Sequence, residues 1–143
     1  MSTGTAFEDL EIGQSASAQH VVTEGDIAAF ADLSGDHNPV HLDEAFAQTT
    51  PFKGRIAHGI LSGAFISALI ATKLPGPGSI YISQSLNFRR PVRINDALDV
   101  TVTVTALDPA KARATLATVG AVAGKTVVEG EAVLMVPRRP AAS

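Results

Sequence analysis

The 143-residue sequence predicts an α+β fold in which an antiparallel sheet packs against one central apolar helix. Three observations predict it. Residues 58–73 are apolar with helical spacing, residues 98–105 alternate between apolar and polar side chains, and turn residues separate several strand-like segments after the helix. A content of 45% hydrophobic and 17% charged residues is typical of a chain that folds around a core. We therefore expect one domain over residues 1–143, with its core at 8–136 and short flexible tails.

The N-terminal part predicts a strand followed by a capped helix. Residues 16–22 have strand character, and Thr23 followed by Asp26 is an N-cap signal with an acidic first turn. The helix should end at Gly35, because the Gly, Asp, Asn and Pro that follow favour caps and turns. Residues 36–41 are therefore predicted to form a loop.

The apolar helix predicted at residues 58–73 follows a short helix at 43–48 and a connection at 49–55. It is apolar nearly all round, which is typical of a helix that protein surrounds on most sides. Polar residues interrupt it too often for a membrane span. The Pro and Gly residues at 74–78 end it.

Four strand-like segments follow the apolar helix, and we predict that they form a meander of consecutive antiparallel strands which the earlier strand joins. A sheet that packs on so long an apolar helix should curve around it. The four segments are residues 79–88, 98–105, 112–121 and 125–136.

The charge and the residue types exclude several classes of function. The formal net charge is −3 and the basic residues are scattered, so nucleic acid is not an expected partner. The absence of cysteine excludes disulfides, thiolate metal sites and cysteine nucleophiles, and suits a cytoplasmic protein. The first eight residues lack the basic and apolar pattern of a secretory signal, so we do not expect export.

The densest polar cluster in the sequence runs from Ser34 to His41, with the order Ser-Gly-Asp-His-Asn-Pro-Val-His. It places a carboxylate, Asp36, and two imidazoles, His37 and His41, on a loop, where rigid scaffolds commonly present catalytic groups. Pro39 disfavours an undisturbed helix here, but a turn can bring Asp36 and His41 together. An aspartate and a histidine that share one water molecule are competent for general acid–base chemistry near neutral pH.

Two other interpretations fit the same residues. In the first, Asp36 caps a turn, Asn38 and Pro39 shape the loop, and the histidines are structural. Loop composition alone favours this interpretation, because such turn roles are common. In the second, Asp36, His37 and His41 bind a metal ion, although the sequence offers no further carboxylate at a fixed spacing.

The start of the apolar helix, Ala57-His58-Gly59, is a second candidate for substrate contact. Backbone N–H groups at a helix N-terminus lack internal acceptors, and a glycine there lets an oxyanion approach the main chain closely, a need that a thioester carbonyl fits. Close packing at a helix start explains Gly59 equally well. A hydroxyl bonded back to the helix explains Ser62 equally well.

Three segments together carry a family resemblance. Residues 30–41 (Phe-Ala-Asp-Leu-Ser-Gly-Asp-His-Asn-Pro-Val-His), residues 56–59 (Ile-Ala-His-Gly) and residues 87–92 (Asn-Phe-Arg-Arg-Pro-Val) resemble MaoC-like (R)-specific enoyl-CoA hydratases, the first segment being similar to their hydratase 2 motif. The resemblance extends over about residues 8–136. Because the motif is long and specific, it favours the catalytic interpretation over the purely structural one.

The resemblance implies a hot-dog fold, with the sheet wrapped around the central helix, and a homodimer with sites near the subunit interface. It implies that Asp36 and His41 are the catalytic pair and that Asn38 orients them. It further implies that the backbone N–H of Gly59 is the oxyanion donor and that Ser62 lies close to the reacting centre.

The implied activity is the reversible (R)-specific hydration of trans-2-enoyl-CoA to (R)-3-hydroxyacyl-CoA, in fatty acid metabolism, where it diverts β-oxidation intermediates toward polyhydroxyalkanoate. No metal or redox cofactor is expected, since CoA arrives with the substrate. Candidate contacts for the CoA phosphates are Arg89, Arg90 and Arg93. The alternative is that these side chains form only a solvated surface. The alternatives are an acyl-CoA thioesterase of the same fold and a non-catalytic acyl-CoA-binding subunit.

Overall fold

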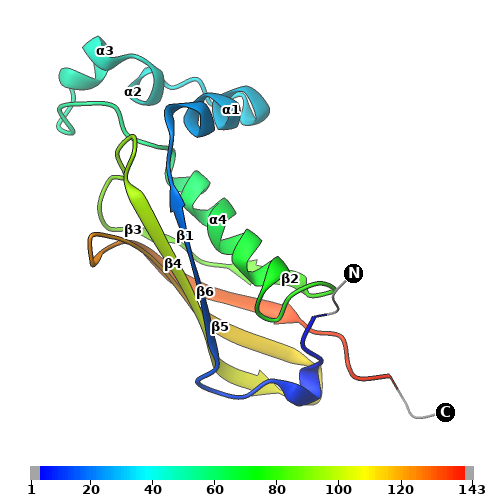
Figure 1. Ribbon diagram of the computed structural model, residues 1–143. Coiled ribbons are helices and arrows are strands. Elements are labelled where there is room, and N and C mark those ends of the chain that lie inside the picture. The colour runs from blue at the N-terminus through cyan, green and yellow to red at the C-terminus, as the bar shows by residue number, and fades with distance from the viewer. Residues whose placement is uncertain (1–3, 141–143) are drawn as a thin grey trace.

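The computed structural model describes residues 4–140, which form one antiparallel sheet lying along a single long helix, α4 (Figure 1). Three short helices, α1 to α3, gather beyond one end of the sheet, next to the start of α4. The helical elements are η1 (Phe7–Asp9), α1 (Glu24–Ser34), α2 (Pro39–Leu42), α3 (Glu44–Gln48) and α4 (Gly59–Thr72). The strands are β1 (Ser15–Val21), β2 (Ile80–Gln84), β3 (Asn87–Phe88), β4 (Ala97–Asp108), β5 (Arg113–Val122) and β6 (Lys125–Met135).

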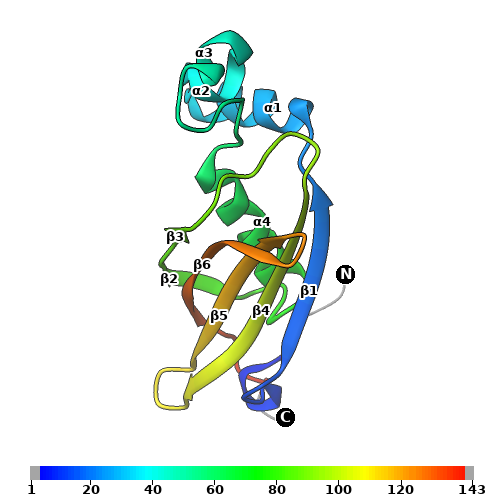
Figure 2. The same ribbon diagram turned by 90° about the vertical axis from the view of Figure 1, so that its left-hand side faces the viewer.

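The strands are ordered β1-β4-β5-β6-β2, and β3 also pairs with β6 (Figure 2). This antiparallel sheet around a helix confirms the predicted hot-dog fold. The predicted meander is correct for β4, β5 and β6 but wrong for the segment before them. Instead of pairing with β4, β2 pairs with β6 at the opposite side of the sheet, and β1 takes the place beside β4.

The predicted strand at 79–88 is interrupted and forms two strands, β2 and β3. At the interruption the Ser85 hydroxyl, rather than a main-chain carbonyl, accepts the N–H of Glu131 at 3.0 Å. The chain also passes very close to β6 there, because a Cβ at Gly130 would lie 1.8 Å from the carbonyl oxygen of Ser85. Only glycine permits this approach, which explains why β6 carries one at that position.

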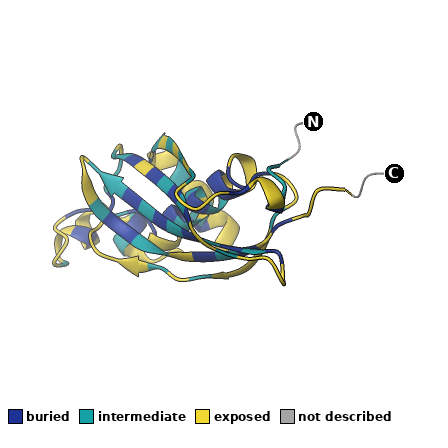
Figure 3. Ribbon diagram, turned by 90° about the horizontal axis from the view of Figure 1, so that it is seen from below, coloured by how far each residue is buried: buried dark blue, intermediate teal, exposed yellow. Residues whose placement is uncertain are grey.

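The core lies between the sheet and one side of α4. Residues of β4 and β5 alternate between buried and less buried positions, so that one face of the sheet packs on the helix (Figure 3). From α4 the buried apolar residues are Leu61, Ile66, Leu69 and Ile70. The expectation that protein surrounds α4 on most sides is wrong for this chain alone, since Ile60 is 58% exposed and Ala64 and Ala68 are also exposed.

The predicted boundaries of α1 are confirmed by its two caps. Thr23 and Asp26 form a capping box, and Gly35 ends the helix in the left-handed conformation with φ of 80°. Asp26 also lies 2.8 Å from the Nε2 of His20 on β1. The hydrogen bond from the Thr23 N–H, followed by that from His20, lowers the pKa of Asp26.

The loop predicted at residues 36–41 is only partly correct, because its second half is the one-turn helix α2. Asn38 caps this helix by accepting the N–H of Val40 at 3.2 Å, and Pro39 occupies its first turn. Proline suits that position because its missing N–H would have no acceptor there.

The ends of the described chain lie together near the end of α4. The N–H of Thr5 donates to the carbonyl of Pro75 at 2.7 Å, and that of Phe7 donates to Pro137 at 2.9 Å. The outermost residues of the predicted flexible tails, 1–3 and 141–143, lie outside the described residues. Within residues 4–140, no helix is long and apolar enough to cross a membrane.

Candidate active site

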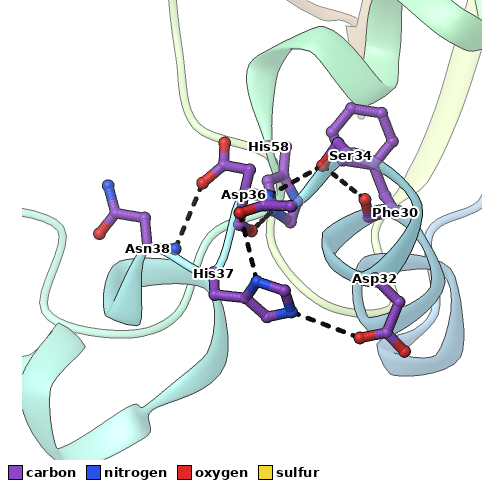
Figure 4. Close-up of polar contacts among 8 residues, drawn as sticks. Phe30, Asp32, Ser34, Asp36, His37, Asn38 and His58 are labelled. Carbon is purple, nitrogen blue, oxygen red and sulfur yellow. Dashed lines mark hydrogen bonds and ion pairs between the residues drawn. The ribbon is translucent and has the colours of Figure 1, made fainter.

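Asp36 is placed by the turn that joins α1 to α2. Its backbone N–H donates to the Ser34 hydroxyl at 3.1 Å, and its carboxylate accepts the backbone N–H of Asn38 at 3.2 Å (Figure 4). The side chain is exposed. The carboxylate is therefore oriented by local main-chain contacts while it stays open to water.

His41 lies on α2 and is 7% exposed. Its Nδ1 lies 2.9 Å from the carbonyl oxygen of Ile56. A carbonyl only accepts hydrogen bonds, so Nδ1 carries the hydrogen and the other ring nitrogen, Nε2, keeps a free lone pair. This tautomer gives His41 a nitrogen that can take a proton.

Side-chain atoms of Asp36, His41 and His58 lie within 4.8 Å of one another. No hydrogen bond joins the carboxylate directly to His41 among the described residues. One water molecule with hydrogen bonds of about 2.8 Å can bridge two groups at this separation. The predicted convergence of Asp36 and His41 is therefore present.

His58 is a site residue that the motif-based prediction passed over. It is 2% exposed, its Nε2 lies 3.0 Å from the backbone carbonyl oxygen of Asp36, and its ring stacks on that of His41 with a centroid separation of 3.9 Å. Figure 4 shows it beside Asp36. The sequence signal was its place just before Gly59, which predicted substrate contact through the backbone of the helix start and not through the His58 ring.

A pocket of about 380 Å³ opens beside His41 and the start of α4. Gly59 and the buried Ser62 line it from the helix, and Phe88 lines it from β3. As the first residue of α4, Gly59 has an N–H for which the helix supplies no acceptor. A Cβ at this position would lie 2.7 Å from the Phe88 ring, so a larger residue here would have to displace that ring.

The side chains of the other polar residues in the loop, Asn38 and His37, do not contact the Asp36 carboxylate or His41. The Asn38 side chain caps α2, and it is the backbone N–H of Asn38 that contacts Asp36. His37 is exposed and lies near Asp32 and the carbonyl of Gly35 (Figure 4), and it does not line the pocket. His58, not His37, therefore completes the group of possible metal ligands around Asp36 and His41.

The two rings of that group pack on one another. The rings of His41 and His58 are stacked with an interplanar angle of 30°. Each ring has one nitrogen at a backbone carbonyl, Nδ1 of His41 at Ile56 and Nε2 of His58 at Asp36. The nitrogens that remain for other contacts are therefore Nε2 of His41 and Nδ1 of His58.

The three candidate arginines differ in their contacts. Arg93 holds the loop before α4 by donating to the carbonyls of Phe52 and Gly54. Arg89 pairs with Glu129 at 2.7 Å, and Arg90 donates to the carbonyl of Thr126. Both Arg89 and Arg90 line the pocket and are exposed, so they are available to contact an anion at its mouth. Arg93 is less available, because its guanidinium group already binds two backbone carbonyls.

Comparison with known proteins gives consistent similarities. A family model described as the MaoC like domain matches residues 9–129. The chain is 58% identical to the (R)-specific enoyl-CoA hydratase of Rhodospirillum rubrum, over 93% of this chain and 92% of that protein. It is similar to the unliganded structure of the R-hydratase PhaJ1 from Pseudomonas aeruginosa, with 50% identity and a TM-score of 0.90 over 98% and 93% of the two chains. It is also similar to the structure of the (R)-hydratase from A. caviae involved in PHA biosynthesis, with 46% identity and a TM-score of 0.88. The match covers 91% of this chain and 99% of that chain.

Proposed function

The chain belongs to the MaoC-like domain family, and from this membership and the site we infer that it is an (R)-specific enoyl-CoA hydratase. It adds water to a trans-2-enoyl-CoA to give (R)-3-hydroxyacyl-CoA and catalyses the reverse dehydration, as a hydro-lyase. The membership confirms the resemblance predicted from the motif. The observation that carries the function is the meeting of Asp36 and His41 beside the start of α4.

We propose that Asp36 and His41 hold one water molecule over the double bond of the substrate. The free Nε2 of His41 and the exposed carboxylate of Asp36 are both able to accept a proton. One group takes a proton from the water as it attacks C3, and the pair supplies a proton to C2. The water oxygen then forms the new C3–O bond, and the electron pair of the double bond forms the C2–H bond.

The backbone N–H of Gly59 is the proposed oxyanion donor. Negative charge develops on the thioester oxygen as water adds, and a preorganised donor aimed at it lowers the barrier by about 3–4 kcal/mol. Ser62 lines the same pocket one turn along α4, close to the proposed position of the thioester. Asn38 contributes to the orientation of the pair through its backbone N–H on Asp36.

The proposed reaction needs no metal or redox cofactor, because the N–H of Gly59 and the helix start polarise the thioester. CoA enters as part of the substrate. Arg89 and Arg90 are the proposed contacts for its phosphates, because they are exposed at the pocket and guanidinium groups bind phosphate with charge-assisted hydrogen bonds.

We also propose a cytoplasmic homodimer. An apolar face remains uncovered on α4 and β2, where Ile60 is 58% and Ile82 is 44% exposed, and both residues line a groove between the two elements. A second copy of the chain would cover this face and extend the sheet across the subunits. The similar (R)-hydratase from A. caviae is involved in PHA biosynthesis. We propose the same metabolic role for this protein, which would supply (R)-3-hydroxyacyl-CoA to that pathway.

One assay separates this function from its alternatives. The purified protein should remove the enoyl absorbance of crotonyl-CoA without releasing free thiol. Thiol release from acyl-CoA would instead identify a thioesterase. Binding of crotonyl-CoA with neither change would identify a non-catalytic acyl-CoA-binding subunit.

A further inference from the structure

The proposed reaction gives no role to the buried ring of His58. This residue is the N-cap of α4, yet its side chain makes no capping hydrogen bond. Instead the ring lies among parts of the site that are distant in sequence. Its Nε2 lies 3.0 Å from the Asp36 carbonyl oxygen. Its ring stacks on that of His41 at a centroid separation of 3.9 Å and lies tilted against that of Phe30 at 4.8 Å.

The contacts of His58 define its protonation. The Asp36 carbonyl only accepts a hydrogen bond, so Nε2 carries the hydrogen. The other nitrogen, Nδ1, is buried and has no hydrogen-bond partner within residues 4–140. A hydrogen on Nδ1 would have no acceptor among these residues. His58 is therefore assigned as a donor through Nε2, with no hydrogen on Nδ1.

We propose that His58 is a positioning residue that fixes the Asp36 loop and the His41 ring relative to the oxyanion donor. The inference rests on the proposed hydratase function. Within residues 4–140, the other hydrogen bonds of Asp36 are to Ser34 and Asn38, in its own turn. The bond from His58 links that turn to α4, next to Gly59. Its ring simultaneously supports His41 from one face.

A neutral ring suits this role for an electrostatic reason. His41 becomes an imidazolium when it accepts a proton, and a charged neighbour 3.9 Å away would oppose that step. A neutral His58 supports the ring without this repulsion. A displacement of about 1 Å among reacting groups costs up to about 10²-fold in rate, so loss of the support should reduce turnover more than substrate binding.

Two substitutions separate the hydrogen bond from the stacking. His58→Phe keeps an aromatic ring but removes the donor, whereas His58→Gln keeps an N–H donor but removes the ring. We expect His58→Phe to lower kcat by about 10- to 100-fold with KM for crotonyl-CoA unchanged within about twofold. His58→Gln should recover part of that loss. The matched control is His37→Phe at the exposed histidine of the same loop, which should leave kcat within about twofold of the unsubstituted protein.

The same substitution in an Asp36→Asn background tests whether His58 acts through Asp36. If it does, His58→Phe should cost much less there than in the unsubstituted protein, since residues that act as a unit are non-additive. A folded His58→Phe variant with kcat within twofold overturns the proposal. So does a loss confined to KM, or an equal loss in both backgrounds.

Ring-nitrogen NMR of the unsubstituted protein tests the proposal independently of folding in the variants. His58 should carry its hydrogen on Nε2. A His58 that carries its hydrogen on Nδ1 instead overturns the proposal. Failure of the unsubstituted protein to hydrate crotonyl-CoA would instead overturn the proposed function. The NMR spectrum would still show whether His58 carries its hydrogen on Nε2.

Discussion

At the scale of single residues, backbone carbonyls decide what the site can do. The carbonyl of Ile56 sets the tautomer of His41, and the carbonyl of Asp36 sets that of His58. Two neighbouring imidazoles thereby acquire different properties, since His41 presents a proton acceptor to the pocket and His58 donates its hydrogen to the loop. Neither property follows from the residue type alone.

Asp36→Asn and His41→Ala should each lower kcat for crotonyl-CoA by about 10²–10⁴-fold, the cost of removing a positioned acid or base. Each variant should stay folded, because Asp36 is exposed and His41, although buried, is not a member of the apolar core. Steady-state kinetics on variants with native circular dichroism would measure this effect.

The double variant should be little worse than the poorer single variant, because both groups act on one water. His37→Ala is the control and should cost far less, since its side chain lies near Asp32. Hydration at near-normal rates by folded Asp36→Asn or His41→Ala would show that the catalytic assignment is wrong while the fold assignment stands.

Arg90→Ala should raise KM for crotonyl-CoA by about two- to fivefold, the scale of one exposed ion pair. It should leave KM for crotonyl-pantetheine unchanged, because that thioester lacks the phosphates of CoA. Lys111→Ala in the turn between β4 and β5 is a control with the same charge change away from the pocket. Equal effects on both substrates would exclude a phosphate contact by Arg90.

At the scale of elements, the caps of α1 connect its stability to pH. Asp26→Asn weakens the capping box and the contact with His20, so it should lower the free energy of unfolding by about 1 kcal/mol at neutral pH. The folded-state pKa of Asp26 lies below its unfolded value of about 4. The carboxylate therefore stabilises the fold above that value, and its contribution is lost as pH falls through the folded pKa.

Urea denaturation at several pH values measures this contribution. The difference between the unsubstituted protein and Asp26→Asn should be constant at neutral pH and should shrink below about pH 4. A difference that stays the same in acid would mean that the charge of Asp26 contributes nothing.

The elements with local signals were predictable, and those that depend on distant contacts were not. Thr23 and Gly35 mark the ends of α1 because caps act within one turn. The interruption at Ser85 depends on its approach to Gly130, which is far away in sequence. The place of β2 beside β6 is likewise a long-range pairing that periodicity does not specify.

The site residues also differ in whether a local sequence signal could predict them. Asp36 and His41 belong to one short motif, so a local pattern was enough to predict that they meet. His58 reaches them from 22 residues beyond Asp36. A histidine at the start of a helix has many uses, and only the folded chain places its ring against His41.

At the scale of the whole molecule, the uncovered face of α4 and β2 predicts a homodimer. Ile82→Lys should convert the dimer to a monomer, because it places a charge in the apolar groove beside Ile60. Ile12→Lys is the matched control, since Ile12 is 68% exposed in the turn before β1. Light scattering that finds the unsubstituted protein monomeric and fully active would contradict the arrangement.

Dialysis of the protein against a chelator should leave its hydratase activity unchanged. The proposed reaction polarises the thioester through a backbone N–H rather than a Lewis acid. Activity that is lost on dialysis and restored by zinc or manganese would instead assign Asp36, His41 and His58 to a metal site. A buffer-only dialysis controls for loss by handling.

The order of the elements along the chain also has a consequence for biosynthesis. The apolar helix α4 ends at Thr72, whereas most of the sheet that covers it, β4 to β6, begins only at Ala97. A ribosome synthesises the N-terminus first, so this helix emerges before the surface that buries it exists. A nascent chain that stops in this interval exposes its most apolar segment to water and to other chains. Protection by chaperones is therefore needed most between the synthesis of α4 and that of β6.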